Sequence, residues 1–341
     1  MSDLITPTEH GLYCAPGDFH IDPWRSVDRA LITHGHADHA RAGHGHYWAA
    51  RPGLGILYQR LGRDIALTGV DYGQPLDFGG VRVSFHPAGH VLGSAQIRVE
   101  YDGEVWVASG DYKRQPDPTC AAFEVVPCDT FITEATFALP VYRWDDTPAV
   151  AADIRHWWQT NAEAGRTSVL FCYSLGKAQR LLAELAGLAD MPAGAMAYLH
   201  GALVPLTRLY REAGIDMLAT EPVSACDKRH DFARALVMAP PSAAGSRWMR
   251  RFPRHSTGFA SGWMRIRGNR RRRGYDRGFV LSDHADWPGL IDTIEATGAH
   301  RVLATHGRTD VLVAYLRDRG IDAAPLVTEY ADTAEAEARA D

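Results

Sequence analysis

The stretch Thr33-His34-Gly35-His36-Ala37-Asp38-His39 says more about the fold than any other part of this chain. It follows Ala30-Leu31-Ile32, a short apolar run that predicts a buried strand. Imidazole nitrogen and carboxylate oxygen suit zinc, manganese or iron. The four metal-binding side chains of this stretch are too close along the chain to converge tetrahedrally on one ion, but they can serve two ions about 3.5–4 Å apart. The pattern therefore predicts a binuclear metallohydrolase.

The bulk composition is that of a soluble globular protein. The chain has 341 residues, of which 46% are hydrophobic and 23% charged. It contains no apolar run of about 20 residues and no secretory signal near Met1, so we expect a cytoplasmic protein with no membrane association. The five cysteines are scattered and form no CxxC pair, which argues against a disulfide framework and a thiolate metal site.

Positive charge is unevenly spread along a chain whose net charge is −5. Arginine carries almost all of it and gathers between Arg247 and Arg277, including the run Arg270 to Arg273. Arginine forks suit phosphate oxygens, so a local basic face on an acidic protein is compatible with nucleic acid held at one site. A solvated loop is the alternative explanation of the same feature.

The pattern of expected secondary structure changes twice along the chain. Residues 1–140 predict short strands, with a hairpin at Asp102-Gly103. After about residue 145 strands and helices alternate, which is typical of a parallel α/β unit. From about residue 259 strands that end in charged loops return. We therefore predict an α/β protein with one domain over 1–145, an inserted domain over 146–258, and the completion of the first domain over 259–341.

The His34–His39 stretch resembles the metallo-β-lactamase superfamily, whose fold is an αββα sandwich. Three further residues match that superfamily's series in order, each after a predicted strand. They are Asp22 in Phe19-His-Ile-Asp22, His90 in Ala88-Gly-His90, and Asp111 in Ser109-Gly-Asp111. The resemblance implies that His90 is a ligand, that Asp111 bridges two metals, and that Asp22 orients the cluster from behind.

Three later motifs resemble the β-CASP branch of that superfamily, which processes nucleic acids. They are Ile132-Thr-Glu134-Ala-Thr136, Leu281-Ser-Asp-His284-Ala-Asp286 and Leu303-Ala-Thr-His306-Gly307. The intervening α/β block matches the inserted cap domain of the branch, so the resemblance covers roughly residues 10–330. It implies that His34, His36 and His90 hold one metal, and that Asp38, His39 and His306 hold the other.

The segment from Ala260 to Trp287 is similar to that of the bacterial ligase-associated DNA exonucleases. This likeness implies a DNA substrate and a functional association with an ATP-dependent DNA ligase and a helicase in repair. His306, however, is typical of RNA-processing members of the branch. An RNA nuclease resembling ribonuclease J or the mRNA 3′-end-processing nuclease is therefore the alternative.

By the same resemblance the cofactors are two divalent ions, with zinc as first choice and manganese as the alternative. A hydroxide held between the ions would attack phosphorus in line with the leaving oxygen. We expect His284, oriented by Glu134, to protonate the leaving group or steady the phosphate. Asp38 and Asp22 complete the catalytic set.

Six residues are candidates for contacts with phosphate. Ser174, Gly176 and Lys177 open a predicted helix after a strand, where backbone N–H groups and the helix dipole favour anions. Ser242 and Ser246 stand in a second turn of this kind, and Arg267 in the Arg-rich segment is the sixth. No full Walker pattern is present, and Gly-Lys at a helix start is common.

Two rival functions are less well supported. Small-molecule metallohydrolases of this superfamily, which act on thioesters, lactones or β-lactams, generally lack the inserted cap and the Glu134, His284 and His306 series. A non-catalytic binding module would tend to lose ligands, whereas here every expected ligand is present. Cleavage from a 5′ end is our expectation for polarity. His44 and His46 are expected to have a structural or a solvent-exposed role because the ligand set is already full.

Overall fold

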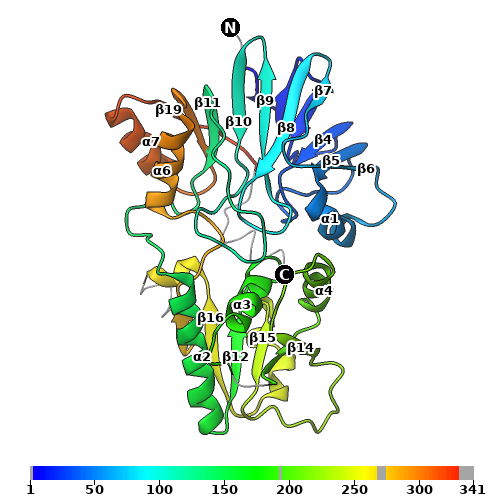
Figure 1. Ribbon diagram of the computed structural model, residues 1–341, viewed down its shortest axis with the longest axis vertical. Helices are drawn as coiled ribbons and strands as arrows, with labels where there is room; N and C mark the ends of the chain where they lie inside the picture. The colour runs from blue at the N-terminus through cyan, green and yellow to red at the C-terminus, as the bar shows by residue number, and fades with distance from the viewer. Residues whose placement is uncertain (1–2, 192–193, 267–273, 330–341) are drawn as a thin grey trace. The chain divides into compact units, whose positions relative to one another are not determined.

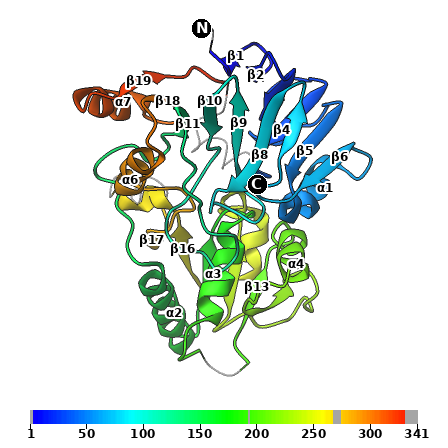
Figure 2. The same cartoon turned by 45° about the horizontal axis from the view of Figure 1, so that its top comes forward.

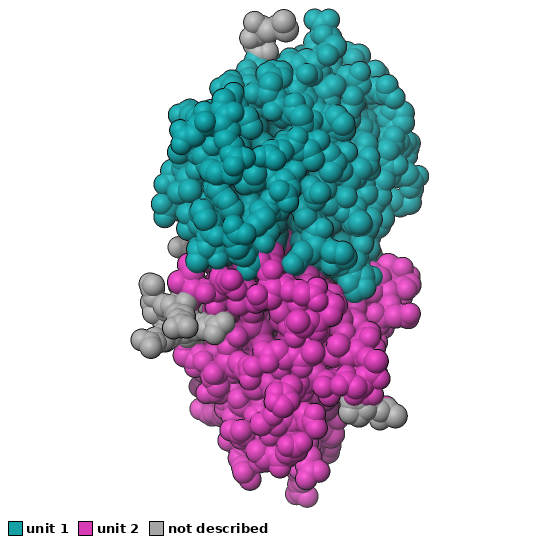
Figure 3. Space-filling view, turned by 60° about the vertical axis from the view of Figure 1, so that its left-hand side comes forward, with its two compact units in different colours: residues 1–143, 284–336, 340 teal, residues 144–283, 337–339, 341 magenta. Residues whose placement is uncertain are grey.

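The computed structural model describes residues 3–191, 194–266 and 274–329. The chain forms two compact units (Figure 3). Unit 1 comprises the chain up to Arg143 together with the segment that starts at His284, and unit 2 runs from Trp144 to Asp283. Within the described residues, no helix combines the length and the apolar character needed to cross a lipid bilayer.

The first sheet of unit 1 is built from the N-terminal strands in sequence order. Its strands β3 to β6 run parallel, while β1 and β2 are antiparallel to their neighbours. The 3₁₀ turn η1 (Arg51–Gly53) and helix α1 (Leu54–Leu61) connect β5 to β6. The strands are β1 (Thr6–Pro7), β2 (Leu12–Cys14), β3 (Phe19–Ile21), β4 (Arg29–Ile32), β5 (His46–Ala50) and β6 (Leu67–Val70).

The second sheet of unit 1 has the order β19-β18-β11-β10-β9-β8-β7 in the described part of the chain. Strands β10, β11, β18 and β19 run parallel, and β7 to β10 form an antiparallel meander. The strands are β7 (Leu76–Phe78), β8 (Val81–Pro87), β9 (Ala95–Tyr101), β10 (Glu104–Ala108), β11 (Thr130–Glu134), β18 (Arg301–Thr305) and β19 (Asp322–Pro325). Helices α6 (Trp287–Thr297) and α7 (Thr309–Asp318) complete the unit.

Unit 1 has four layers, because each sheet buries both of its faces. The two sheets pack on each other through one core that includes Leu31, Phe85 and Ile97. The outer face of the first sheet packs against α1 through Ile32 and Leu57. The outer face of the second sheet is covered by α6 and α7, which lie beside β11 and β19 (Figure 1). The predicted αββα sandwich is therefore confirmed.

The predicted hairpin is present between β9 and β10. Tyr101 pairs with Glu104, which leaves Asp102 and Gly103 as a two-residue loop. Both residues have positive φ, 50° and 79°. Such a turn matches the right-handed twist of the flanking strands, and this is why the Asp-Gly pair predicted it.

Unit 2 is built on a sheet of parallel strands in the order β14-β13-β15-β12-β16-β17. The strands are β12 (Thr167–Phe171), β13 (Met196–Leu199), β14 (Ala219–Pro222), β15 (Leu236–Ala239), β16 (His255–Ala260) and β17 (Arg277–Phe279). The described helices and 3₁₀ turns are α2 (Thr147–Glu163), α3 (Lys177–Ala186), α4 (Val204–Glu212), η2 (Pro241–Ala243), η3 (Arg247–Arg251) and η4 (Gly262–Arg265).

The central strands of this sheet are buried on both faces. One face packs against α2 and α3 through Leu170, Ile154 and Leu181. In Figure 2, α3 lies between α2 and α4. The other face carries Phe171 and Phe259 and packs against Phe252 of the segment after η3. Two-sided burial explains why these strands appear in the sequence as apolar runs without alternation.

The return to unit 1 lies further along the chain than the sequence pattern suggested. We expected it near residue 259, whereas the compact units divide at Asp283 and His284. The physical reason is β16 and β17, which pair in parallel with each other and with β12 and so extend the sheet of unit 2. The first division falls at Arg143–Trp144, close to the expected residue 145.

Candidate metal centre

The candidate site residues of unit 1 stand on loops that follow strands. Asp111 follows β10, Glu134 ends β11, and His306 follows β18. These three strands are parallel neighbours, so their carboxyl ends lie at one edge of the sheet. His90 follows β8, and the His34–His39 loop follows β4. The rigid sheets therefore bring residues from distant parts of the sequence to one place.

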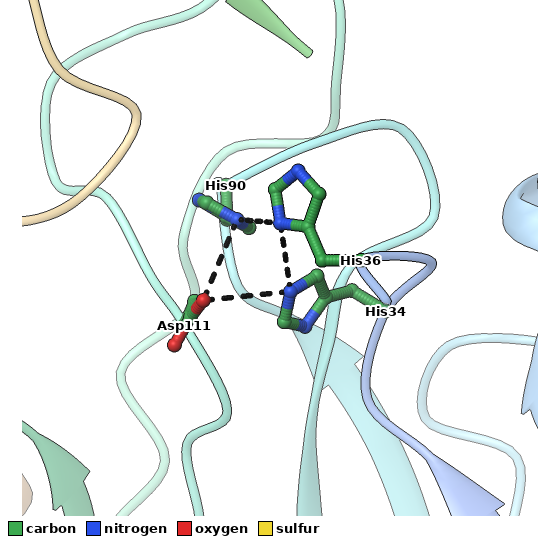
Figure 4. Close-up of side chains that lie close together, drawn as sticks. All are labelled: His34, His36, His90 and Asp111. Carbon is green, nitrogen blue, oxygen red and sulfur yellow. Dashed lines mark hydrogen bonds and ion pairs between the residues drawn. The ribbon is translucent and has the colours of Figure 1, made fainter. Parts of the chain in front are cut away.

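Three imidazoles and one carboxylate form a first group of potential metal ligands. The donor atoms of His34, His36, His90 and Asp111 all lie within 4.8 Å of one another (Figure 4). Nδ1 of His36 lies 3.0 Å from Nε2 of His34 and 3.0 Å from Nε2 of His90. One ring nitrogen cannot make a linear hydrogen bond to both, so this convergence suits a shared cation better than mutual bonding.

Asp38, His39 and His306 form a second group with the same spacing limit. The rings of His39 and His306 stack with their centroids 5.2 Å apart and their planes at 10°. Nε2 of His39 lies 3.7 Å from Oδ2 of Asp38 and 3.6 Å from Oδ2 of Asp111. The second group therefore adjoins the first through Asp111.

Asp111 occupies the centre of the arrangement. Its Oδ2 atom lies 3.4 Å from Nε2 of His34 and 3.8 Å from Nε2 of His90, besides its contact with His39. Its other oxygen, Oδ1, is buried and has no hydrogen-bond partner among the described residues. A buried carboxylate oxygen left without a donor is costly unless a cation binds it. The nitrogen and oxygen donor set thus fits a pair of divalent metals.

Asp22 fixes the orientation of one imidazole in each group. Oδ2 of Asp22 accepts hydrogen bonds from the Thr33 hydroxyl at 2.5 Å and from Nδ1 of His39 at 2.7 Å. Thr33 Oγ1 in turn lies 3.0 Å from Nδ1 of His34 and can accept its proton. Both imidazoles then direct Nε2 toward Asp111, and loss of the Nε2 proton gives the form that binds a metal.

Two glycines permit the close approach of these loops. A Cβ on Gly110 would lie 2.7 Å from the side chain of Thr33, and one on Gly307 would lie 2.5 Å from the carbonyl oxygen of Ala135. Both glycines also have positive φ, 55° and 60°. His306 itself has a φ of 60°, a conformation that costs roughly 1 kcal/mol or more for a residue with a side chain. The loops are thus held in position at some conformational cost.

The electrostatics of the centre match a site built for cations. Burial, together with repulsion from neighbouring imidazoles, holds the pKa of His34 well below its usual value. Burial also lowers the pKa of His306 to about 3. For His39 burial acts in the same direction, but the carboxylates of Asp111, Asp38 and Asp22 outweigh it and raise the pKa to about 10. Burial raises the pKa of Asp111 to about 7, against the opposing effect of His39.

Glu134 and His284 form a buried pair beside the first group. Nδ1 of His284 lies 2.9 Å from Oε2 of Glu134, while Oε1 of Glu134 accepts the Tyr112 N–H at 2.7 Å. Burial opposes ionisation of Glu134, but the attraction of His284 outweighs it and lowers the pKa of the carboxyl. The His284 ring lies 4.7 Å from that of His90. Glu134 and His284 therefore lie in hydrogen-bond contact, and an orienting role of Glu134 stays a prediction.

In unit 2, Ser174, Gly176 and Lys177 do lie between a strand and a helix. They connect β12 to α3, and the polar groups of Gly176 and Lys177 are engaged within the unit. The Gly176 N–H donates to Oε1 of Gln179 at 2.9 Å, and the Lys177 N–H donates to the Leu175 carbonyl at 3.1 Å. The Lys177 ammonium lies 3.3 Å from Oδ2 of Asp283 and is buried. A phosphate-binding role for these three residues stays a prediction.

Ser242 and Ser246 lie in the loop after β15, and both are exposed. Strands β12 and β15 are parallel neighbours, with Phe171 opposite Ala239. From β12 the chain crosses to β13 on one side, and from β15 it crosses to β16 on the other, so the two loops diverge at a topological switch point. Ligands of parallel α/β sheets bind at such points. Arg267 lies outside the described residues.

Two residues of the buried clusters could not be recognised from the sequence. One is Thr33, whose hydroxyl links Asp22 to His34. The other is Arg180, which is fully buried in unit 2 and donates to the Ser282 carbonyl at 2.6 Å and to Thr147 Oγ1. Both lie inside regular elements or next to stronger motifs, and nothing in the local sequence separates them from ordinary Thr and Arg.

Comparisons with known proteins agree with this geometry. The chain is 32% identical over 323 residues to a protein of Opitutus terrae named "Probable DNA ligase", covering 92% of this chain and 30% of that one. It is 27% identical over 218 residues to "Endoribonuclease YSH1" of Mycosarcoma maydis, covering 52% of this chain and 24% of the relative. It is 32% identical over 117 residues to "Cleavage and polyadenylation specificity factor 73" of Drosophila melanogaster, covering 33% and 16%.

The chain belongs to the β-CASP branch of the metallo-β-lactamase superfamily. It spans less than a third of the length of each of these relatives. No family model matches it. A crystal structure of a protein of unknown function from Enterococcus faecalis superposes with a TM-score of 0.56 at 11% identity, covering 90% of this chain and 80% of the other. That likeness concerns the fold alone.

Proposed function

We propose that this β-CASP protein is a two-metal phosphodiesterase that degrades DNA from an end, with cleavage from the 5′ end as the expected polarity. The observation that carries the proposal is the central position of Asp111 between two groups of ligands, with His284 beside them. Sites that hold two metal ions about 3.5–4 Å apart catalyse the in-line displacement of phosphodiesters.

His34, His36 and His90 would hold one ion, and Asp38, His39 and His306 the other, with Asp111 shared. When bound, two divalent ions supply a nucleophilic water at neutral pH and neutralise charge on phosphate oxygens. Zinc is our first choice and manganese the alternative, because both accept nitrogen and oxygen donors. Asp22 would hold the imidazole of His39 directly, and that of His34 through Thr33, with Nε2 toward the ions.

His284 is proposed to donate a proton to the leaving oxygen or a hydrogen bond to the phosphate. Its Nδ1–H is held by Glu134, which leaves Nε2 as the nitrogen available to a substrate. The negative charge of Glu134 favours the protonated imidazole, which is the form that a general acid needs. Because Glu134 and His284 are both buried, their contact keeps the His284 ring in one orientation.

The nucleic-acid strand is proposed to contact unit 2 at the switch point between β12 and β15. Ser174, Gly176 and Lys177 stand on one side of that point, and Ser242 and Ser246 on the other. Arg267 is proposed as a further phosphate contact. The Lys177 ammonium is paired with Asp283. We therefore propose that it stabilises the turn after β12 and does not contact phosphate directly.

DNA is the proposed substrate because the relative that matches 92% of this chain is named "Probable DNA ligase". A functional association with an ATP-dependent DNA ligase and a helicase is part of the same proposal. An RNA substrate is the second candidate, because the relatives named for endoribonuclease activity match up to 52% of the chain. The two candidates share one metal centre and differ in substrate.

Matched DNA and RNA strands of one sequence, labelled at either end and incubated with zinc- or manganese-loaded protein, test the proposal. We expect mononucleotides from 5′-labelled DNA before any release from the 3′ label. Equal or faster loss of RNA would favour the second candidate, and internal fragments would overturn action from an end. No cleavage of either strand, with two metals bound, would refute the phosphodiesterase.

The His284→Ala variant separates the chemical role of that residue from a ligand role. We expect cleavage to fall by about 10²–10⁴-fold, the usual contribution of a positioned acid, with metal content unchanged. Elemental analysis of the purified variant is the control. Loss of an ion from His284→Ala would instead place the imidazole in the ligand shell.

A further inference from the structure

The second half of unit 2 concentrates positive charge on a chain that is acidic overall. Residues 227–255 contain seven Lys or Arg residues and two Asp residues, which gives this segment a net charge of +5. The whole chain has a net charge of −5, so the remainder carries −10. A local excess of cations on an acidic protein is the electrostatic footprint of a polyanion site.

A groove of about 700 Å³ lies in this part of unit 2. Its walls include Ser246, Met249, Arg250, His255, Thr257 and Tyr275, all within the described residues. The Tyr275 ring is half-buried and is fixed from behind, stacked on Phe259 at 4.9 Å and tilted against Phe171 at 5.2 Å. A ring held in this way can offer an aromatic surface without a further loss of side-chain entropy.

Two arginines beside the groove have no partner among the described residues. Arg247 and Arg250 are exposed and make no hydrogen bond or ion pair there. Both belong to the 3₁₀ turn η3, in which side chains three residues apart lie on the same side. Arg250 lines the groove, and Arg247 therefore extends its cationic edge.

Some other arginines of the surface are engaged within the protein. Arg251, also in η3, donates to the Asp227 carbonyl at 2.9 Å and lies over the Phe232 ring. Arg208 is ion-paired with Glu212 at 3.5 Å, and Arg319 with Glu295 at 2.8 Å. The carboxylate of Asp276, the residue after Tyr275, already accepts the Thr257 N–H at 2.8 Å. Arg247 and Arg250 thus remain available for an external anion.

We propose that this groove, which we call the η3 groove, binds a single strand of nucleic acid. Phosphates of the strand lie along Arg247 and Arg250, and a base packs toward Tyr275. Single strands are bound in this way in general, by a cationic edge that follows the backbone and an aromatic surface that meets the bases. The inference rests on the proposed function, because it assumes a nucleic-acid substrate, and it names the strand that unit 2 holds.

The test measures binding of a labelled 20-nucleotide oligo(dT) in the presence of EDTA, where cleavage cannot occur, over a range of salt concentrations. Each lost phosphate contact lowers the slope of log K against log salt by about 0.7 for single strands. The Arg247→Ala/Arg250→Ala double variant is therefore expected to lose about 1.4 from the slope. Its affinity at about 0.1 M salt should fall roughly 10-fold.

The matched control is Arg63→Ala/Arg166→Ala, which removes two exposed arginines that do not line the groove. It makes the same change in net charge and should leave the slope unchanged. Tyr275→Leu should weaken oligo(dT) binding several-fold without changing the slope, since it removes stacking but no charge. Circular dichroism of each variant verifies folding.

An unchanged slope in the double variant, or an equal loss in the control, would refute the η3 groove. Tighter binding of a 20-base-pair duplex than of oligo(dT), equally dependent on Arg247 and Arg250, would also refute the assignment to a single strand. Failure of the proposed function is detected separately. If the metal-loaded wild-type protein does not hydrolyse bis(p-nitrophenyl) phosphate or any oligonucleotide, the phosphodiesterase is wrong whatever the binding result.

Discussion

Each unit contains a buried cluster of ionisable side chains, and the two clusters are built in opposite ways. In unit 2, Lys177 and Arg180 face Asp283 at 3.3 and 3.4 Å, so opposite charges are paired within the protein. Arg180 also donates to Thr147 and to the Ser282 carbonyl. In unit 1, imidazole nitrogens face one another at 3.0 Å, and Oδ1 of Asp111 has no hydrogen-bond partner among the described residues.

Burial of charged groups has a different consequence in each unit. A buried cluster whose members satisfy one another serves structure, because nothing further is needed to offset desolvation. A cluster whose donors and acceptors do not match requires an external group. The same physical cost therefore identifies one cluster as a structural tie and the other as a candidate metal centre. Substitutions in the two clusters are therefore expected to have different effects, on metal binding in unit 1 and on stability in unit 2.

The largest effect is expected from Asp111→Asn in the ligand cluster of unit 1. It removes the carboxylate shared by the two ligand groups, so we expect the loss of at least one ion and a fall in phosphodiesterase activity of about 10³-fold or more. Elemental analysis and oligonucleotide cleavage measure the two outcomes. Glu124→Gln, which changes an exposed carboxylate paired with His86, is the matched control. Two retained ions in Asp111→Asn would contradict the bridging assignment.

Arg180→Met tests the charge-paired cluster of unit 2, and it should lower only the free energy of unfolding. Removing one partner of a buried ionic network typically costs about 3–5 kcal/mol, because Asp283, the Ser282 carbonyl and Thr147 lose their donor. Urea denaturation of the whole protein, followed by tryptophan fluorescence, measures the loss, while metal content should stay at the wild-type value. Arg208→Met, an exposed pair with Glu212, should change the free energy of unfolding by about 0.5 kcal/mol or less.

Asp22→Asn should have an intermediate effect, on metal affinity. The amide can still accept the Thr33 N–H, but it cannot accept protons from both the Thr33 hydroxyl and Nδ1 of His39. Loss of such an outer contact usually weakens metal binding by about 10–100-fold. Competition with a chromophoric chelator measures the affinity. Thr33→Val, which keeps the His39 contact, should weaken binding less, and equal losses would argue against the orienting role of Asp22.

The smallest effect concerns His44, a buried imidazole of unit 1 outside both ligand groups. Its Nδ1 accepts the Val27 N–H at 3.3 Å, and its Nε2 is buried without a hydrogen-bond partner in the part of the chain that the structure describes. Burial lowers its pKa from 6.5 to about 4. The folded state thus resists protonation, so stability is full above about pH 7 and falls as the pH drops from 6.5 toward 4.

His44→Asn keeps an acceptor for Val27 but removes the titrating ring. The variant should therefore lose less stability than the wild type between pH 7.5 and pH 4.5, by at most about 2–3 kcal/mol. Parallel urea titrations at the two pH values give the difference. Identical pH dependence of the two proteins would show that His44 does not titrate in this range.

Much of the fold and the centre could be predicted from the sequence because the strongest signals are local. His34, His36, Asp38 and His39 lie within six residues, and Asp102-Gly103 specifies its own turn. The series His90, Asp111 and His306 could be placed by its resemblance to a family pattern. By contrast, the role of Thr33 depends on Asp22, eleven residues earlier, and the role of Arg180 depends on Asp283, about a hundred residues later.

The sequence alone determined which chemistry is available, since donor types, apolar runs and turn residues are properties of short segments. Tertiary structure decided which charges are compensated. Lys177 follows Gly176 at the start of a helix, a pattern that suggested an anion site, yet its ammonium meets Asp283. Tertiary structure also set the limits of unit 2, because β16 and β17 join its sheet through parallel pairing. Pairing between distant strands and compensation between distant charges depend on distances in space, which local sequence does not encode.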